Sequence, residues 1–439
     1  MAAPEGTRAL MPASALPLAY YAIAHAGFGV ALGVLIVDPS LPGSSFYHPR
    51  LVALVHLLTL AWISGSILGS LYIVGPLALR IPMIVRRMDW VGFAAFLTGT
   101  IGMVSHFWIG TYDGMAWSAA LVLVPIARAG WLMARGLRRS AAPPAVLLHV
   151  ALAFLNIAAA ATLGILIGLN RTRGFMTISP LAAMFAHAHL AAIGWAAMLV
   201  IGLSYRLIPM MLPAAMPVGR SLALSAIFLE TGLLVTVAAL LSNSAWLLGG
   251  ALLIVAGFGS FVMRLREALK HRLPRPPALP ARDWSTWQTH GAFLWLVVAV
   301  VLGVVLSTGA GGDTRLPLMW VYAVAGLVGF LGQVIPGIAG RLVPMYAWYR
   351  AFASKGGPPD RAVHDLPNAQ FAFRIFVAWT AGAPLMAYGL AASSEVATRA
   401  GAAFLLIGVL LGAAYIRHMF ITAQRVDPAE SAFRRTGAG

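Results

Sequence analysis

The stretch that decides the fold is MFAHAHLAAIGWAAMLVIGLSYRLIPMML, residues 184–212. It is apolar apart from two histidines near its start and a few residues near its far end, and it is long enough to cross about 30 Å of hydrocarbon. Because an imidazole is costly in hydrocarbon, His187 and His189 indicate a functional site. Side chains at i and i+2 point about 200° apart on a helix, so the two histidines address opposite sides of it. This spacing predicts two neighbouring sites and argues against one chelate.

The composition is that of a polytopic membrane protein. Of 439 residues, 60% are hydrophobic and only 10% are charged. The chain has no cysteine, which excludes disulfides, thiolate metal sites, iron–sulfur clusters and covalently attached c-type haem. Imidazole is then the obvious strong ligand for a soft or borderline metal.

Twelve segments are long and apolar enough to be membrane-spanning helices. They are about 17–37, 51–77, 89–109, 115–135, 145–169, 181–212, 221–241, 245–264, 287–307, 317–345, 371–391 and 399–421. The longest loops are about 265–286 and 346–370, and neither has the composition of a separate domain. We therefore expect one all-α integral membrane domain over residues 1–439.

The net charge of +17 is a topology signal. Most of the Lys and Arg lie at the termini and in the loops that follow even-numbered spans. The opposite loops hold Arg50, Arg171, Arg173, Arg315 and Arg399. Because basic residues concentrate on the cytoplasmic side, both termini are expected in the cytoplasm, and nucleic acid is not expected as a partner.

A pattern of residues recurs along the chain at an interval of about four helices. His56 and His189 are each followed by Trp at +6, Gly at +13, Tyr at +16 and Pro at +20. The paired residues are Trp62 and Trp195, Gly69 and Gly202, Tyr72 and Tyr205, and Pro76 and Pro209. Coincidences at this many fixed offsets are hard to obtain by chance, so the pattern indicates an internal repeat.

The tenth span carries a third, degenerate copy of the pattern. Residues 340–344, GRLVP, echo residues 205–209, YRLIP. In that register Tyr322 stands where His187 stands, and Val324 stands where His189 stands. The sequence therefore predicts three pseudo-symmetric four-helix units, at about 15–140, 141–270 and 285–425.

Four histidines are expected at one depth, in the outer half of the membrane: His56, His106, His187 and His189. A haem inside a helical bundle needs axial imidazoles from helices that face each other across a gap. Its propionates need positive or donor groups, and the five outer arginines lie near the same depth. These residues are the candidate cofactor and metal ligands.

The sequence resembles the haem–copper oxidase superfamily. The resemblance rests on three four-helix units, twelve spans and a His-x-His followed by Gly at +13 and Pro at +20. The likeness is to the catalytic subunit of terminal oxidases and nitric oxide reductases, and to their divergent relatives. It implies haem b, one or two groups, with copper also allowed. It further implies a bacterial or archaeal inner membrane, surrounding lipid, and an electron donor such as a partner subunit, a cytochrome or a quinol.

This sequence departs from the family pattern in three ways. The family's His-x-His lies on its tenth helix, whereas here it lies on the sixth, and the tenth span has no histidine. The family's His-x-x-x-Tyr copper motif is absent, since Leu60 stands four residues after His56. The family's adjacent histidine pair is missing, and the third span offers only His106.

Two assignments of the histidines stay open. Carried over from the family, His187 would hold a gas-binding haem and His189 a low-spin haem, with His56 and His106 near the copper position. The repeat register instead predicts that His56 and His187 face one gap as a bis-imidazole pair. His189 would then face Tyr322 across the next gap and could carry a second haem.

Three functions fit these features. The first is a haem-binding redox protein that transfers electrons and could reduce O₂ or NO. The second is a secondary transporter or a haem or metal exporter whose intramembrane histidines bind substrate or protons. The third is a gas or haem sensor without turnover.

Overall fold

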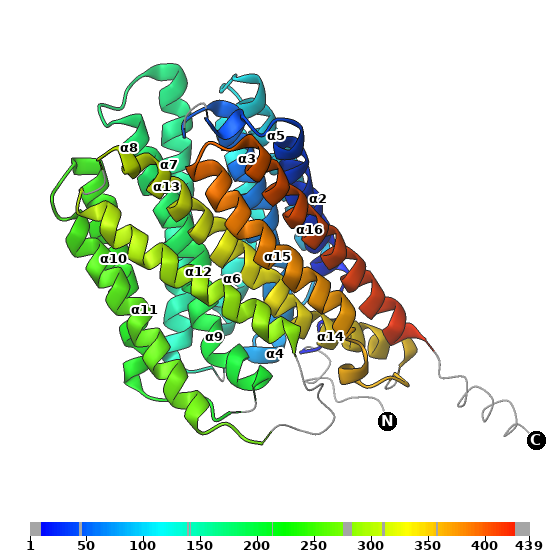
Figure 1. The fold of residues 1–439 in the computed structure, drawn as a ribbon. Helices are drawn as coiled ribbons and strands as arrows, with labels where there is room; N and C mark the ends of the chain where they lie inside the picture. Colours follow the sequence, from blue (N-terminus) through cyan, green and yellow to red (C-terminus); the bar gives the residue numbers. More distant parts are fainter. Residues whose placement is uncertain are drawn as a thin grey trace, which may run out of the picture.

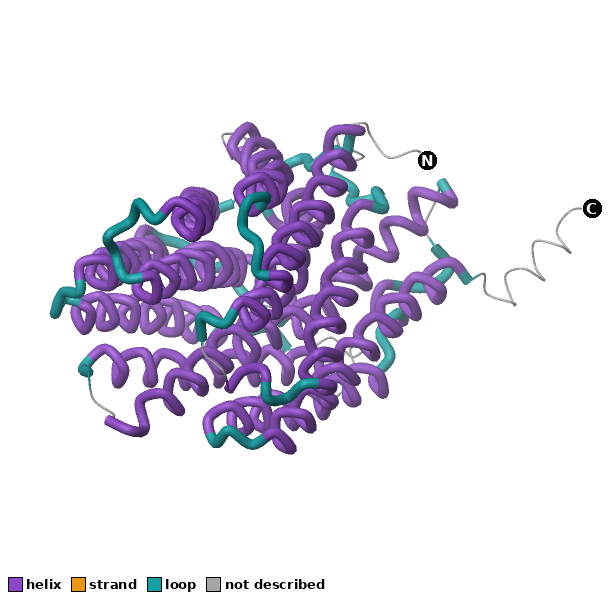
Figure 2. The backbone as a smooth tube through the Cα atoms, turned by 90° about the horizontal axis from the view of Figure 1, so that it is seen from above, coloured by secondary structure: helices purple, strands orange, loops and turns teal. Residues whose placement is uncertain are grey.

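The computed structural model describes residues 10–43, 46–137, 140, 142–212, 214–274, 283–309, 312–356 and 359–425. Over these residues the chain is helical, with loops between the helices and no strand (Figure 2). Within the described ranges, twelve helices are long and apolar enough to span a membrane, which confirms the predicted all-α membrane fold. Both described ends of the chain lie at the same side of the bundle, called here the terminal side (Figure 1).

The first four spans run from α2 to α6. Their elements are α2 (Leu16–Val37), α3 (Pro49–His56) continued by η2 (Leu57–Ser64) and α4 (Gly65–Ala78), α5 (Arg87–Ile109) and α6 (Met115–Leu137). The next four are α7 (Pro144–Arg173), α8 (Pro180–His189) continued by η3 (Leu190–Ala197) and α9 (Met198–Met211), α10 (Ala223–Ser242) and α11 (Leu247–Lys270).

The last four spans run from α12 to α16. They are α12 (Trp284–Ser307), α13 (Arg315–Ala323) continued by η6 (Val324–Gly332) and α14 (Gln333–Lys355), α15 (Ala369–Ala391) and α16 (Glu395–Gln424). Short 3-10 turns connect some of them: η1 (Leu41–Gly43), η4 (Arg220–Leu222), η5 (Gly312–Thr314) and η7 (Val363–Asp365). The tenth helix runs to Lys355, where Gly356 adopts a left-handed φ of 70°, so the expected loop at 346–370 is shorter than predicted.

The second, sixth and tenth spans form the centre of the bundle, since they have the most buried windows of the twelve. Each contains a π-helical segment: η2, η3 and η6 begin at Leu57, Leu190 and Val324. A π-helical segment replaces the i→i+4 hydrogen bonds of the α-helix by i→i+5 bonds and is frequent at functional sites. The segments η2 and η3 both contact η6.

The structure gives the repeated residues a packing role. Trp62 Nε1 donates to the Gly332 carbonyl at 3.1 Å, and Trp195 Nε1 donates to Ser64 Oγ at 3.3 Å, so each tryptophan ties its central helix to another. The repeated glycines let a central helix approach the first helix of its unit. A Cβ at Gly202 would lie 2.3 Å from His149 Cβ. The boundaries of the three repeat units stay predictions.

The repeated tyrosines bind polar groups near the terminal side. Tyr72 donates to Asp89 Oδ1 at 3.0 Å, and the Tyr205 hydroxyl lies 3.0 Å from Ser225 Oγ. Asp89 is buried and also receives Arg128 Nε at 2.9 Å. The repeat is therefore explained by contacts that hold the central helices to their neighbours.

Candidate functional site

The central feature of the site is a pair of histidines on adjacent central helices. His56 ends α3 and His187 lies in α8, and their ring centres are 6.4 Å apart with planes inclined by 23°. This arrangement agrees with the repeat register, in which His56 and His187 face one gap. Phe107 also stacks on His56, with ring centres 4.9 Å apart.

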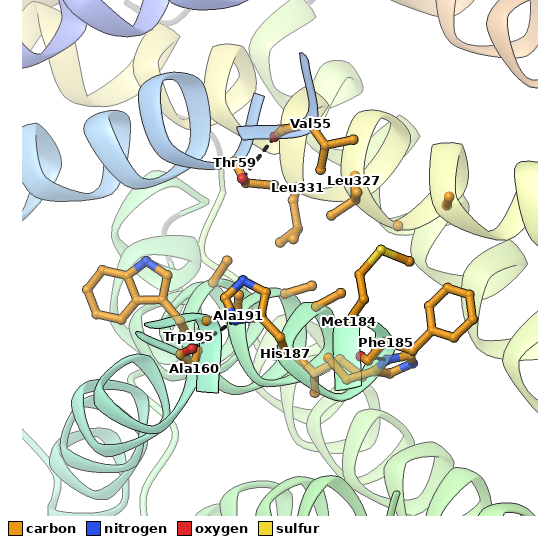
Figure 3. A pocket seen from close by; sticks show the side chains of 18 of the residues that line it. Val55, Thr59, Ala160, Met184, Phe185, His187, Ala191, Trp195, Leu327 and Leu331 are labelled. Atoms are coloured by element: carbon orange, nitrogen blue, oxygen red, sulfur yellow. Dashed lines mark hydrogen bonds between the residues drawn. The ribbon is translucent and has the colours of Figure 1, made fainter. Parts of the chain in front are cut away.

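The backbone fixes the tautomer of both rings. His56 Nδ1 donates to the Val52 carbonyl at 2.8 Å, and His187 Nδ1 donates to the Ala160 carbonyl at 2.8 Å (Figure 3). Because a carbonyl can only accept, each Nδ1 carries the proton and each Nε2 keeps its lone pair. Among the described residues, neither Nε2 has a hydrogen-bond partner.

The His187 ring lies against a glycine of α7. A Cβ at Gly164 would stand 2.9 Å from His187 Cε1 and 3.1 Å from Nδ1. Side chains essentially never approach that closely, so the ring occupies the space that any other residue at position 164 would need. The bond to Ala160 and the opening at Gly164 together set the orientation of the imidazole.

A second pair lies between the sixth and tenth spans. His189 Nδ1 donates to the Phe185 carbonyl at 2.8 Å, so its Nε2 accepts the Tyr322 hydroxyl proton at 3.0 Å. The ring centres are 6.1 Å apart, and Tyr322 packs against Gly303. His187 and His189 thus address two different gaps, as the i, i+2 spacing predicts.

Both pairs line one cavity of about 500 Å³. Its wall is mostly aliphatic and aromatic and includes residues of the second, sixth and tenth spans. Met184, Ala191, Leu327 and Leu331 are among the lining residues, together with His187 (Figure 3). Ligand cavities of this size are typical of cofactor sites. The third gap, between the tenth and second spans, has Leu54 and Val324 at the equivalent positions, and both are buried.

The predicted arginines divide into two groups. Arg171 and Arg315 line the cavity. Arg171 Nε donates to the Tyr47 hydroxyl at 2.8 Å, and its guanidinium lies 3.7 Å from the centre of that ring. The others do not line the cavity: Arg50 lies over Trp108, Arg173 is exposed, and Arg399 donates to the Ile36 carbonyl.

His106 is not brought together with the other histidines. Its Nδ1 lies 3.0 Å from the Thr111 carbonyl, and its ring packs against Gly114, in the connection between α5 and α6. It does not line the cavity. Sequence reasoning also missed Phe107 and Gly164, because neither residue stands out from the apolar background of its span.

Comparison with known proteins supports the architecture. No protein-family model matches the sequence, and no curated protein is similar to it. Among solved structures, the chain is similar to a haem–copper terminal oxidase determined as a dimer by cryo-EM. The TM-score is 0.56 at 12% identity, covering 94% of this chain and 85% of that one. The chain has the fold of a haem–copper terminal oxidase. At this identity the likeness concerns the path of the helices.

The residues on this oxidase-like fold fit a haem between His56 and His187. Their ring centres lie 6.4 Å apart, which leaves room for one iron between them. In the part of the chain that the structure describes, neither Nε2 has a hydrogen-bond partner, and the space at Gly164 accommodates the His187 ring. The apolar cavity suits a macrocycle.

The residues do not fit a copper site of the kind the resemblance implies. Within the described part of the chain, which includes all eleven histidines, no group of three His, Cys, Asp or Glu side chains could hold a metal ion. His189 Nε2 is already engaged by Tyr322. The described residues therefore do not form the copper site that the resemblance allows.

Proposed function

We propose that the protein binds a b-type haem between His56 and His187 and transfers electrons within a bacterial or archaeal inner membrane. The observation that carries the proposal is the pair of imidazoles with ring centres 6.4 Å apart, each held at Nδ1 by a backbone carbonyl so that Nε2 keeps its lone pair. The shared fold with a haem–copper terminal oxidase supports it. When bound, the haem would supply a one-electron redox centre.

The chain contributes ligation, orientation and surroundings. His56 and His187 would hold the haem iron, and their Nδ1 bonds to carbonyls raise the basicity of Nε2. The mostly apolar cavity wall would lower the local dielectric constant around the haem. Arg171 and Arg315, on the wall, are suited to bind the propionate carboxylates through charge-assisted hydrogen bonds.

Electron transfer is the redox function that this geometry favours. Reduction of O₂ or NO needs an open coordination position on the metal, whereas a haem held by both imidazoles would have none and would be suited to electron transfer. A second haem on His189 would have to displace the hydrogen bond to Tyr322. The electron donor is proposed to be a partner subunit, a cytochrome or a quinol, with both termini in the cytoplasm and lipid around the bundle.

A detergent extract tests the proposal directly. We expect a Soret band and a pyridine haemochrome spectrum of haem b, with the low-spin signature of two axial imidazoles. An extract without haem would rule the proposal out and favour the transporter or exporter. If neither a quinol nor a cytochrome reduces the haem, but NO changes its absorption spectrum, the result would instead favour the sensor.

Replacing His189 by alanine is expected to leave the haem between His56 and His187 in place, because His189 faces Tyr322 across another gap. The haem content per protein and the low-spin spectrum should match those of the parent. Loss of the same haem in this variant and in a His187 variant would contradict the assignment of two separate sites.

Replacing Gly164 by valine is expected to displace the His187 ring, because the new Cβ would stand 2.9 Å from Cε1. Haem content should fall severalfold, or the spectrum should shift from low spin toward high spin. Gly326, which also lines the cavity but has no atom within 4 Å of a built Cβ, provides the matched control as Gly326→Ala. Equal spectra for the two variants would show that the space at Gly164 does not determine the position of the His187 ring.

A further inference from the structure

Two arginines in the last turns of α6 lie against one tryptophan. The guanidinium carbons of Arg128 and Arg135 are 4.9 Å and 4.6 Å from the ring centre of Trp131. Because both distances end at the same point, the two positive charges are at most about 10 Å apart. Trp131 is 48% exposed, so its ring and both arginines can be reached from outside the bundle. Like charges held this close repel each other, and an anion beside them would relieve the repulsion.

The start of α5 lies at the same level as this tryptophan. Asp89, near the start of α5, binds Arg128 of α6 at 2.9 Å, and the two helices pack along one another in opposite directions. Residues two and three before Asp89 are therefore level with residues two and three after Arg128. Arg86 and Arg87 occupy the first pair of positions, Trp131 stands at the end of the second, and both arginines are exposed. Four arginines thus gather where α5 begins and α6 nears its end.

The positive charge in this region exceeds the negative charge that accompanies it. Within residues 80–100 and 120–137, Asp89 is the one acidic side chain. Its carboxylate is buried and is already bound by Arg128 and by the Tyr72 hydroxyl. Among the residues that the structure describes, the side chains of Arg86, Arg87 and Arg135 form no ion pair. The region therefore keeps a net positive charge that faces outward.

The exposed face of α6 has the order of polarity found along a phospholipid. Leu121 and Val124, which are 37% and 43% exposed, lie deeper in the span. Arg128, Trp131 and Arg135 follow on the same face, about one, two and three turns further toward the terminal side. In a bilayer, the first two residues border acyl chains and the last three lie at the level of the headgroups.

We infer that Arg86, Arg87, Arg128, Trp131 and Arg135, called here the α5–α6 corner, bind one anionic phospholipid of the leaflet at the terminal side. The guanidiniums of Arg128 and Arg135 would donate charge-assisted hydrogen bonds to the phosphodiester. The acyl chains would lie along the apolar part of the same face of α6. The excess of arginine favours a headgroup with a net negative charge over one whose phosphate is balanced by an ammonium group. None of the five residues lines the cavity, so this inference is independent of the proposed function.

Native mass spectrometry of the detergent-solubilised full chain, titrated with phosphatidylglycerol, tests this inference. We expect one lipid to bind each chain at concentrations at which phosphatidylethanolamine does not bind. Arg135→Gln should weaken binding about fivefold, which is the effect of one arginine near an anionic headgroup. The double variant Arg87→Gln, Arg135→Gln should weaken it by more than about tenfold.

The matched control is Arg266→Gln. Arg266 is an exposed arginine near the end of α11, on the same side of the bundle, and it is not part of the α5–α6 corner (Figure 1). Its replacement removes the same charge from the chain, and the affinity for phosphatidylglycerol should equal that of the parent. If Arg135→Gln binds phosphatidylglycerol as tightly as Arg266→Gln and the parent do, the inference is overturned.

The melting temperature gives a second readout that also checks folding. A ligand that binds only the folded chain raises the melting temperature by mass action. Phosphatidylglycerol should therefore stabilise the parent and Arg266→Gln more than it stabilises Arg135→Gln. Equal melting temperatures of the three proteins without added lipid would show that each one folds. Equal stabilisation of all three by the lipid would contradict the assigned site.

Inorganic phosphate distinguishes a lipid headgroup from a free anion. We expect millimolar phosphate neither to raise the melting temperature of the parent nor to displace phosphatidylglycerol, because free phosphate has no acyl chains to place along α6. Displacement of the lipid by phosphate would show a site for a free anion and would overturn the assignment to a phospholipid. Binding of phosphatidylethanolamine as tight as that of phosphatidylglycerol would overturn the selection for net negative charge.

Discussion

Alanine in place of His187 is expected to abolish haem binding to the purified protein. The substitution removes one of the two facing imidazoles and leaves a lone ligand, His56, in an apolar cavity. Because two axial bonds hold a b-type haem that has no covalent attachment, we expect the Soret absorbance per protein to fall at least tenfold. His56→Ala should have the same effect, since the two rings act as a pair.

The matched control is His106→Ala. His106 is an intramembrane histidine near the same end of the bundle, but it binds the Thr111 carbonyl and does not line the cavity. Its haem content should equal that of the parent. Comparable yields and melting temperatures of all three variants would show that the chain folds in each. Retention of the parent spectrum in His187→Ala would contradict the assigned ligand pair.

The largest expected effect on stability comes from Arg128→Met. Arg128 Nε binds Asp89, whose side chain is fully buried and also accepts from Tyr72 and from the Arg86 backbone amide. Removing the guanidinium leaves a buried carboxylate without its counter-charge, which typically costs about 3–5 kcal/mol. We expect a lower melting temperature in detergent and a much smaller yield of folded protein.

A surface ion pair provides the comparison for this variant. Lys270 binds Glu267 one turn away at the exposed end of α11, and both side chains are more than half exposed. Lys270→Met should leave the melting temperature unchanged within error, because water and salt screen such pairs. If Arg128→Met were equally harmless, the Asp89 cluster would not hold α5 and α6 to the central helix α4.

Much of the fold was predictable because the bilayer restricts what a chain can do. Apolar length alone identifies the twelve spans, since each spanning segment must satisfy its own backbone. The repeat of His56 and His189 predicted which histidines face which gap. The observed pairs, His56 with His187 and His189 with Tyr322, follow that register.

Other features depend on tertiary contacts that leave no local pattern. The three π-helical segments have no sequence signature, since their residues are ordinary membrane residues. The opening at Gly164 matters only because His187 packs there, and glycine is common in membrane helices. Depth alone grouped His106 with the other histidines, but depth does not say which way a side chain points.

One contact makes the candidate ligands unequal. His56 and His189 each bond a carbonyl of their own helix, four residues back, whereas His187 bonds a carbonyl of α7. Sliding or rotation of α7 against α8 would therefore turn the His187 imidazole and leave the His56 imidazole unmoved. The ligand-field strength at a metal bound by both rings would then depend on the position of α7 relative to α8. A spin-state measurement under membrane tension or on binding of a partner would report that motion.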